Sequence, residues 1–121
     1  MTKPVSVSPR LQQDPLVNKL FTAILSLRTE DECSRFFDDL CTIGEIKALA
    51  QRLEVACMLE SNCTYSEISQ KVGASTATIS RVRRFLRGGA GGYRLVMERM
   101  RQRDPVLNRE RRELGGEDHG Q

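Results

Sequence analysis

The stretch VGASTATISRVRRFLRGG, residues 72–89, decides how this chain folds. Its middle, TATIS, is made of small and β-branched side chains that alternate roughly between polar and apolar, which alone is typical of a β-strand. A glycine precedes this middle part, and four arginines follow it within seven residues. These flanks favour the other interpretation, a helix of weak helix formers whose exposed surface touches a partner.

The residues before the stretch favour the helix. Ile68 and Val72 share one face of a short helix, and Gly73 ends that helix because glycine adopts a positive φ at little cost. Ser75 can then cap a second helix. The apolar positions of this second helix fall on one side and point back at the first: Ile79, Val82 and Leu86. The spacing predicts a helix-turn-helix over residues 65–86.

The rest of the ordered chain also has helical signals. Apolar side chains recur every three or four residues between Leu16 and Leu25, which is typical of an amphipathic helix. Three Thr-x-x-Glu capping boxes begin at Thr29, Thr42 and Thr64; in each, the hydroxyl accepts from a first-turn amide and the carboxylate reaches back to the cap's own amide. The expected helices span residues 14–27, 30–41, 43–60, 65–72 and 93–103, besides the second helix of the helix-turn-helix. The sequence GGAGG at 88–92 predicts a hinge before the last one.

The 121 residues, of 13.7 kDa, fit one domain with tails. We expect a flexible arm at 1–13, a helical domain at 14–103, and a disordered tail at 104–121 that holds the only histidine, His119. No apolar run approaches the roughly 20 residues of a membrane span, and the start has no signal-peptide core. The four cysteines have no zinc-type spacing, so we expect free thiols in the cytoplasm and no bound metal.

Charge is distributed unevenly along the chain. Residues 30–60 carry eight acidic and three basic side chains, a net charge of −5, whereas residues 68–97 carry six basic side chains and no acid, a net charge of +6. The second segment therefore suits a polyanionic partner.

The outward face of the second helix suits DNA. Ala77, Ser80, Arg81 and Arg84 lie opposite its apolar side: small residues let a helix enter the major groove, and arginines anchor it to phosphates. The start of a helix also favours a phosphate. The candidate DNA contacts are Ser66, Lys71, Ser75, Thr76, Ala77, Ser80, Arg81, Arg83, Arg84 and Arg87.

Two other classes of function compete with DNA binding as interpretations of the sequence. A helical interaction module that binds RNA or an acidic protein has the same basic surface. An enzyme is disfavoured, because no carboxylate pair, Cys/His arrangement or phosphate loop stands out. GGAGG lacks both the preceding strand and the Lys-Ser/Thr of such a loop.

Two motifs carry a family resemblance: LCTIGEIKALAQRLEVACML at 40–59 and TYSEISQKVGASTATISRVRRFL at 64–86. Over about residues 14–101 the chain resembles the Trp repressor superfamily, in particular its YerC/YecD branch. The resemblance implies an all-α fold and an intertwined homodimer that presents one reading head per subunit to double-stranded DNA. It implies a regulator, expected to be a repressor, whose palindromic site has half-sites about one helical turn apart. It also implies base reading by Thr76, Ala77 and Ser80.

The family's corepressor site is matched only in part. Its residue types are retained at Thr42, Arg52, Thr78 and Arg81, which would form a ligand pocket together with the residue at position 85. Phe85, however, stands where the repressor has a serine that holds the amino group of tryptophan, and Val82 replaces a glycine. We therefore expect no tryptophan corepressor and no cofactor, with some other small ligand left open.

Overall fold

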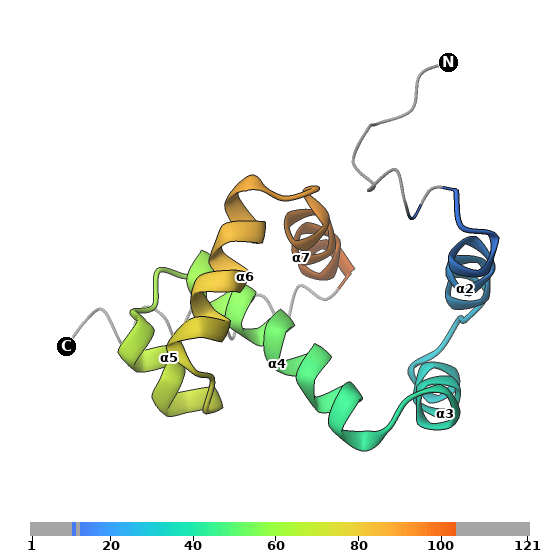
Figure 1. Ribbon diagram of the computed structural model, residues 1–121, viewed down its shortest axis with the longest axis horizontal. Coiled ribbons are helices and arrows are strands. Elements are labelled where there is room, and N and C mark those ends of the chain that lie inside the picture. Colours follow the sequence, from blue (N-terminus) through green and yellow to red (C-terminus); the bar gives the residue numbers. More distant parts are fainter. Residues whose placement is uncertain (1–10, 12, 104–121) are drawn as a thin grey trace, which may run out of the picture. The chain divides into compact units, whose positions relative to one another are not determined.

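The computed structural model describes residue 11 and residues 13–103. Over residues 13–103 the chain forms six helices and no strand (Figure 1), which confirms the predicted all-α class. The helices are α2 (Pro15–Leu25), α3 (Glu30–Leu40), α4 (Ile43–Glu60), α5 (Tyr65–Val72), α6 (Thr76–Gly88) and α7 (Gly92–Arg103). The expected tail at 104–121, with His119, lies outside the described residues, as does most of the expected arm at 1–13.

Helix α2 is shorter than predicted at its C-terminal end. Asp14 is its N-cap, with a carboxylate oxygen that accepts from the Leu16 amide at 2.9 Å, and Pro15 occupies the first helical position, where no amide donor is needed. The helix ends at Leu25, and the hydroxyl of Ser26 donates to the Ala23 carbonyl. The amides of Ser26 and Leu27 donate to carbonyls three residues back, those of Ala23 and Ile24, so the chain leaves the α-helical hydrogen-bond pattern here.

Two of the three predicted capping boxes are complete. At the start of α4, the Thr42 amide donates to the Glu45 carboxylate at 2.8 Å and the Glu45 amide donates to the Thr42 hydroxyl at 3.1 Å. The same reciprocal pair joins Thr64 and Glu67 at the start of α5. Each box satisfies two amides that a helix start leaves without partners.

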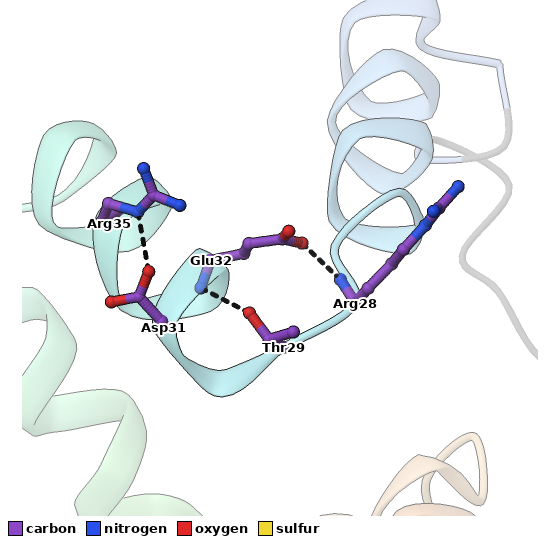
Figure 2. Close-up of polar contacts among 5 residues, drawn as sticks. All are labelled: Arg28, Thr29, Asp31, Glu32 and Arg35. Atoms are coloured by element: carbon purple, nitrogen blue, oxygen red, sulfur yellow. Dashed lines mark hydrogen bonds and ion pairs between the residues drawn. The ribbon is translucent and has the colours of Figure 1, made fainter.

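The third box was predicted wrongly in one of its two bonds. The Thr29 hydroxyl does accept from the Glu32 amide at 3.1 Å, but the Glu32 carboxylate accepts from the amide of Arg28, at 2.8 Å (Figure 2). The φ of Thr29 is −130°, against −77° at Thr64. This rotation about the N–Cα bond brings the preceding amide within reach of the carboxylate. Beyond the cap, Asp31 and Arg35 form an exposed ion pair at 3.0 Å.

The chain divides into two compact units, Met1–Ala50 and Gln51–Gln121, and the boundary falls within α4. The first unit holds α2, α3 and the start of α4. Neither α2 nor α3 contains a buried residue, although both are amphipathic. Several large apolar side chains of this unit are exposed: Leu16, Phe21, Leu25, Leu40, Ile43 and Leu49. Exposed apolar side chains in such number are typical of a region that a partner covers.

The second unit contains the hydrophobic core. Ile68 of α5 and Ile79 and Val82 of α6 are buried against residues from the second half of α4, Val55, Ala56 and Met58, together with Ala74. A smaller cluster joins Cys57 of α4, Leu86 of α6 and Met97 of α7. The buried positions of α6 are those that the sequence predicted.

The segment between α6 and α7 is shorter than GGAGG, because Gly88 and Gly92 are helical and only residues 89–91 lie between the two helices. Gly89 has to be a glycine: a Cβ there would lie 2.4 Å from the carbonyl oxygen of Phe85, which also accepts from the Gly89 amide. Gly91 has a φ of +85°. Only a glycine therefore fits at the C-cap position 89, where the chain leaves α6.

Candidate nucleic-acid interface

Helices α5 and α6 are joined by a turn of three residues, 73–75. Gly73 has a φ of +72°, the left-handed conformation that ends α5, and its amide donates to the Ser69 carbonyl. Ala74 is buried, and Ser75 caps α6. The amide side chain of Gln51, from α4, donates to the Val72 carbonyl at 3.1 Å and so ties the turn to the core helix.

The predicted contact residues lie on the exposed surface of this helix pair. All ten are exposed and lie in α5, the turn or α6: Ser66, Lys71, Ser75, Thr76, Ala77, Ser80, Arg81, Arg83, Arg84 and Arg87. The first turns of α6 carry the small residues, and its later turns carry the four arginines. The helix therefore has small side chains at one end, of the kind that let a helix enter a groove, and a basic end, of the kind that binds phosphates.

The hydroxyl of Ser75 is already engaged within the protein. It accepts from the Thr78 amide at 3.1 Å and bonds the Thr78 hydroxyl, also at 3.1 Å. Both bonds hold the first turn of α6 in place. Ser75 thus orients the amides that a helix start directs at an anion.

Tyr65 is a residue of this surface that the sequence did not single out. Its phenol lies beside the Ser80 hydroxyl, which donates a hydrogen bond that lowers the pKa of Tyr65; the guanidinium of Arg83 and the positive charge of Arg87 lower it further. The ring is half-buried against the core. Tyr65 therefore links the start of α5 to the two α6 residues expected to meet bases and phosphates. Fifteen positions separate it from Ser80, so no helical spacing reveals the contact.

We expect Tyr65 to ionise at a lower pH than a free tyrosine. Because its pKa is lowered only in the folded state, the wild type should gain stability relative to Tyr65→Phe as the pH rises from the folded pKa to the ordinary value of about 10. A titration of phenolate absorbance checks this: the early component should vanish in Tyr65→Phe and persist in Tyr93→Phe. A Tyr65 component at or above the ordinary pKa would contradict the contact.

Phe85 lies on the exposed side of α6 between two arginines. The guanidinium carbon of Arg81 is 5.6 Å from the ring centroid, and that of Arg84 is 5.2 Å from it. Both distances are within the range of about 6 Å for cation–π attraction. Arg81 reaches the ring from one turn before, and Arg84 does so from the adjacent position because its side chain is long.

The candidate ligand residues do not all belong to one unit. Thr42 is in the first unit, where its hydroxyl caps α4, and Arg52, Thr78, Arg81 and Phe85 are in the second. The structure brings Arg81 and Phe85 together. It places Arg52 exposed on α4 and Thr78 half-buried on α6.

Two further properties of the described part of the chain bear on its chemistry. Within residue 11 and residues 13–103, no three histidine, cysteine or acidic side chains gather closely enough to hold a metal ion. None of the helices in that part is both long and apolar enough to cross a membrane.

Comparison with known proteins identifies the family. The family model of the Trp repressor protein matches residues 16–101. This chain belongs to the Trp repressor family. It is 55% identical over 86 residues to the YerC protein of Bacillus subtilis, a match that covers 71% of this chain and 83% of YerC. The resemblance to the YerC branch is thereby confirmed.

Two solved structures of this family share the fold. A candidate Trp repressor from Staphylococcus aureus has a TM-score of 0.73 at 47% identity, covering 78% of this chain and 95% of its own. A TrpR-like protein from Eubacterium eligens also has a TM-score of 0.73, at 53% identity, covering 75% of this chain and 94% of its own. The Trp repressor fold is therefore established, in a family of DNA-binding regulators and not of enzymes.

Proposed function

We propose that this chain is a sequence-specific transcriptional repressor that reads a palindromic DNA site in the major groove as a homodimer. The exposed face of α6 carries the proposal, because it has small residues at its start and four arginines beyond them. No acidic residue occurs between positions 68 and 97 to oppose a phosphate. Such a regulator works in the cytoplasm, which also suits four free thiols.

In the proposed complex, α5 and α6 act as a helix-turn-helix. The first turns of α6 meet base edges through Thr76, Ala77 and Ser80, while Arg84 and Arg87 bind phosphates. Ile79, Val82 and Leu86 are buried, at 0%, 2% and 6% exposure, so the opposite side of α6 is held by packing. Packing supplies the helical stability that TATIS lacks and leaves its small side chains free for the groove.

The homodimer rests on the first unit. Leu16 and Leu25 of α2 are 78% and 84% exposed within one chain, and Phe21, between them, is also exposed. A second copy of the chain would cover this apolar stripe and remove the free-energy cost of exposing it to water. Two heads related by a two-fold axis then match two half-sites about one helical turn apart.

We propose further that tryptophan is not the corepressor. Phe85 stands at the position where the resemblance places a serine for the amino group of tryptophan. A phenyl ring has no hydrogen-bond acceptor for that amino group, and the guanidinium groups of Arg81 and Arg84 already lie against the ring. Repression would then depend on DNA affinity without this ligand.

Selection of bound duplexes from a random pool, with and without added tryptophan, tests both proposals. We expect enrichment of a palindrome and a change of less than about twofold in affinity on adding tryptophan, a difference well under about 1.4 kcal/mol. Binding to single-stranded RNA but not to duplex DNA would instead favour an RNA-binding module. A large effect of tryptophan would overturn the role assigned to Phe85.

A further inference from the structure

Phe85 is 45% exposed, and arginines lie on both sides of it in the sequence of α6. A large apolar ring gains little from burial at such a position, so hydrophobic packing alone does not explain it. The ring instead has two guanidinium groups within 5.6 Å of its centroid, those of Arg81 and Arg84. Phe85 therefore interacts with the two arginines that lie on the outward face of α6.

These arginines have no carboxylate on their own helix to hold them. Residues 68–97 contain no acid, so neither α6 nor the turns at its two ends can supply an ion pair. A free arginine side chain samples many rotamers, and it loses that freedom when it binds a phosphate. A neighbouring group that restricts the guanidinium before binding lowers this cost, and an aromatic face does so while leaving the N–H donors at the edge available.

From this geometry we propose that Phe85 is a positioning residue for DNA binding: its ring holds Arg81 and Arg84 in the orientation that meets phosphates, so the reading head is ordered by the chain itself. The proposal rests on the proposed DNA-binding function. It assigns Phe85 no contact with DNA. It also gives the exposed ring a role that requires no small molecule.

The central test compares Phe85→Leu, which keeps an apolar side chain but removes the aromatic face, with Phe85→Tyr, which keeps the ring. Affinity for the selected duplex is measured over a series of salt concentrations. For Phe85→Leu we expect a loss of about 5- to 30-fold per head, as expected for two exposed cation–π contacts. The salt slope should stay the same, because the arginines still reach the phosphates. Phe85→Tyr should bind as the wild type does.

A double-mutant cycle separates positioning from general damage to α6. In an Arg84→Ala background, Phe85→Leu should cost several-fold less than in the wild type, because one of its two partners is already gone. An undiminished cost would overturn the proposal. So would equal losses in Phe85→Leu and Phe85→Tyr, or wild-type affinity in Phe85→Leu.

A measurement on the free protein keeps the proposal falsifiable even if a variant folds poorly. In the wild type, the side-chain protons of Arg81 and Arg84 should show upfield NMR shifts from the ring current of Phe85, and those of Arg99, on α7, should not. Absence of these shifts would overturn the inference by itself. The wild type could instead show the ring-current shifts but fail to bind any duplex. That result would overturn the proposed function, and with it the role of Phe85 in positioning arginines for DNA.

Discussion

The double substitution Leu16→Glu, Leu25→Glu is expected to convert the protein to a monomer and to lower its affinity for a two-half-site duplex by about 100-fold or more. Both leucines are largely exposed in one chain, so the change removes little packing within that chain. In a dimer it would bury two carboxylates per subunit in an apolar interface, which is strongly unfavourable. In a dimer, binding of one reading head holds the second near its half-site at a high effective concentration. This linkage raises the affinity for the duplex by about 10²- to 10⁴-fold, and a monomer loses it.

A matched control lies on the same helix. Lys19→Glu with Thr22→Glu places two carboxylates on the opposite side of α2, about 180° from the centre of its apolar stripe, and also uses exposed positions. Sedimentation should give a dimer for the wild type and the control, and a monomer for the leucine variant. A leucine variant that stays dimeric, or a wild type that is monomeric at every concentration, would show that α2 does not form the interface.

Replacing Arg84 with alanine is expected to weaken binding to every DNA sequence by about tenfold per head, the value of one charge-assisted hydrogen bond to phosphate. Because each lost phosphate contact lowers the slope of log affinity against log salt by about 0.9, a dimer should lose about 1.8 from that slope. Affinities measured at several salt concentrations, for the selected site and for a random duplex, check both numbers.

Two comparison variants show whether the effect of Arg84→Ala is specific to the proposed reading surface and to a phosphate contact. Arg99→Ala removes an exposed arginine from α7, outside the proposed reading surface, and should change neither affinity nor slope by much. Ala77→Ser changes a residue expected to meet a base edge, so it should alter sequence preference and leave the slope unchanged. Unchanged affinity of Arg84→Ala at low salt would mean that the reading surface lies elsewhere.

The boundaries of α4 and α5 were predictable because their signals lie within a few residues of each other. Helices α4 and α5 begin and end where the sequence predicted, at Ile43–Glu60 and Tyr65–Val72. Threonine caps, Gly73 and apolar periodicity act through contacts three or four residues apart, and these depend little on the rest of the fold. The prediction at Thr29 was wrong because the pattern of residues does not specify the φ angle of the cap. That angle determines which amide donates to the Glu32 carboxylate.

The exposure of the expected contact residues was predictable from the sequence, whereas the contacts among the side chains of this surface were not. The ten expected DNA contacts are all exposed on one helix pair, because the 100° step of a helix determines which side each residue occupies. Tyr65 was missed, since its contact with Ser80 depends on how α5 and α6 pack. The sequence also showed Phe85 only as a departure from the resemblance, not as the partner of two arginines.

By itself, then, the sequence determined the helical class, the helix pair at 65–86, the acidic and basic segments, and the side of α6 that faces outward. These follow from local backbone preferences and from periodicity, which are properties of neighbouring residues. Only the tertiary structure decided that Tyr65 lies against Ser80 and Arg83, and that Phe85 stays exposed beneath the guanidinium groups of Arg81 and Arg84. The contact of Tyr65 depends on how α5 and α6 pack against each other, and the contacts of Phe85 depend on the rotamers of two arginine side chains. A local sequence pattern specifies neither helix packing nor these rotamers.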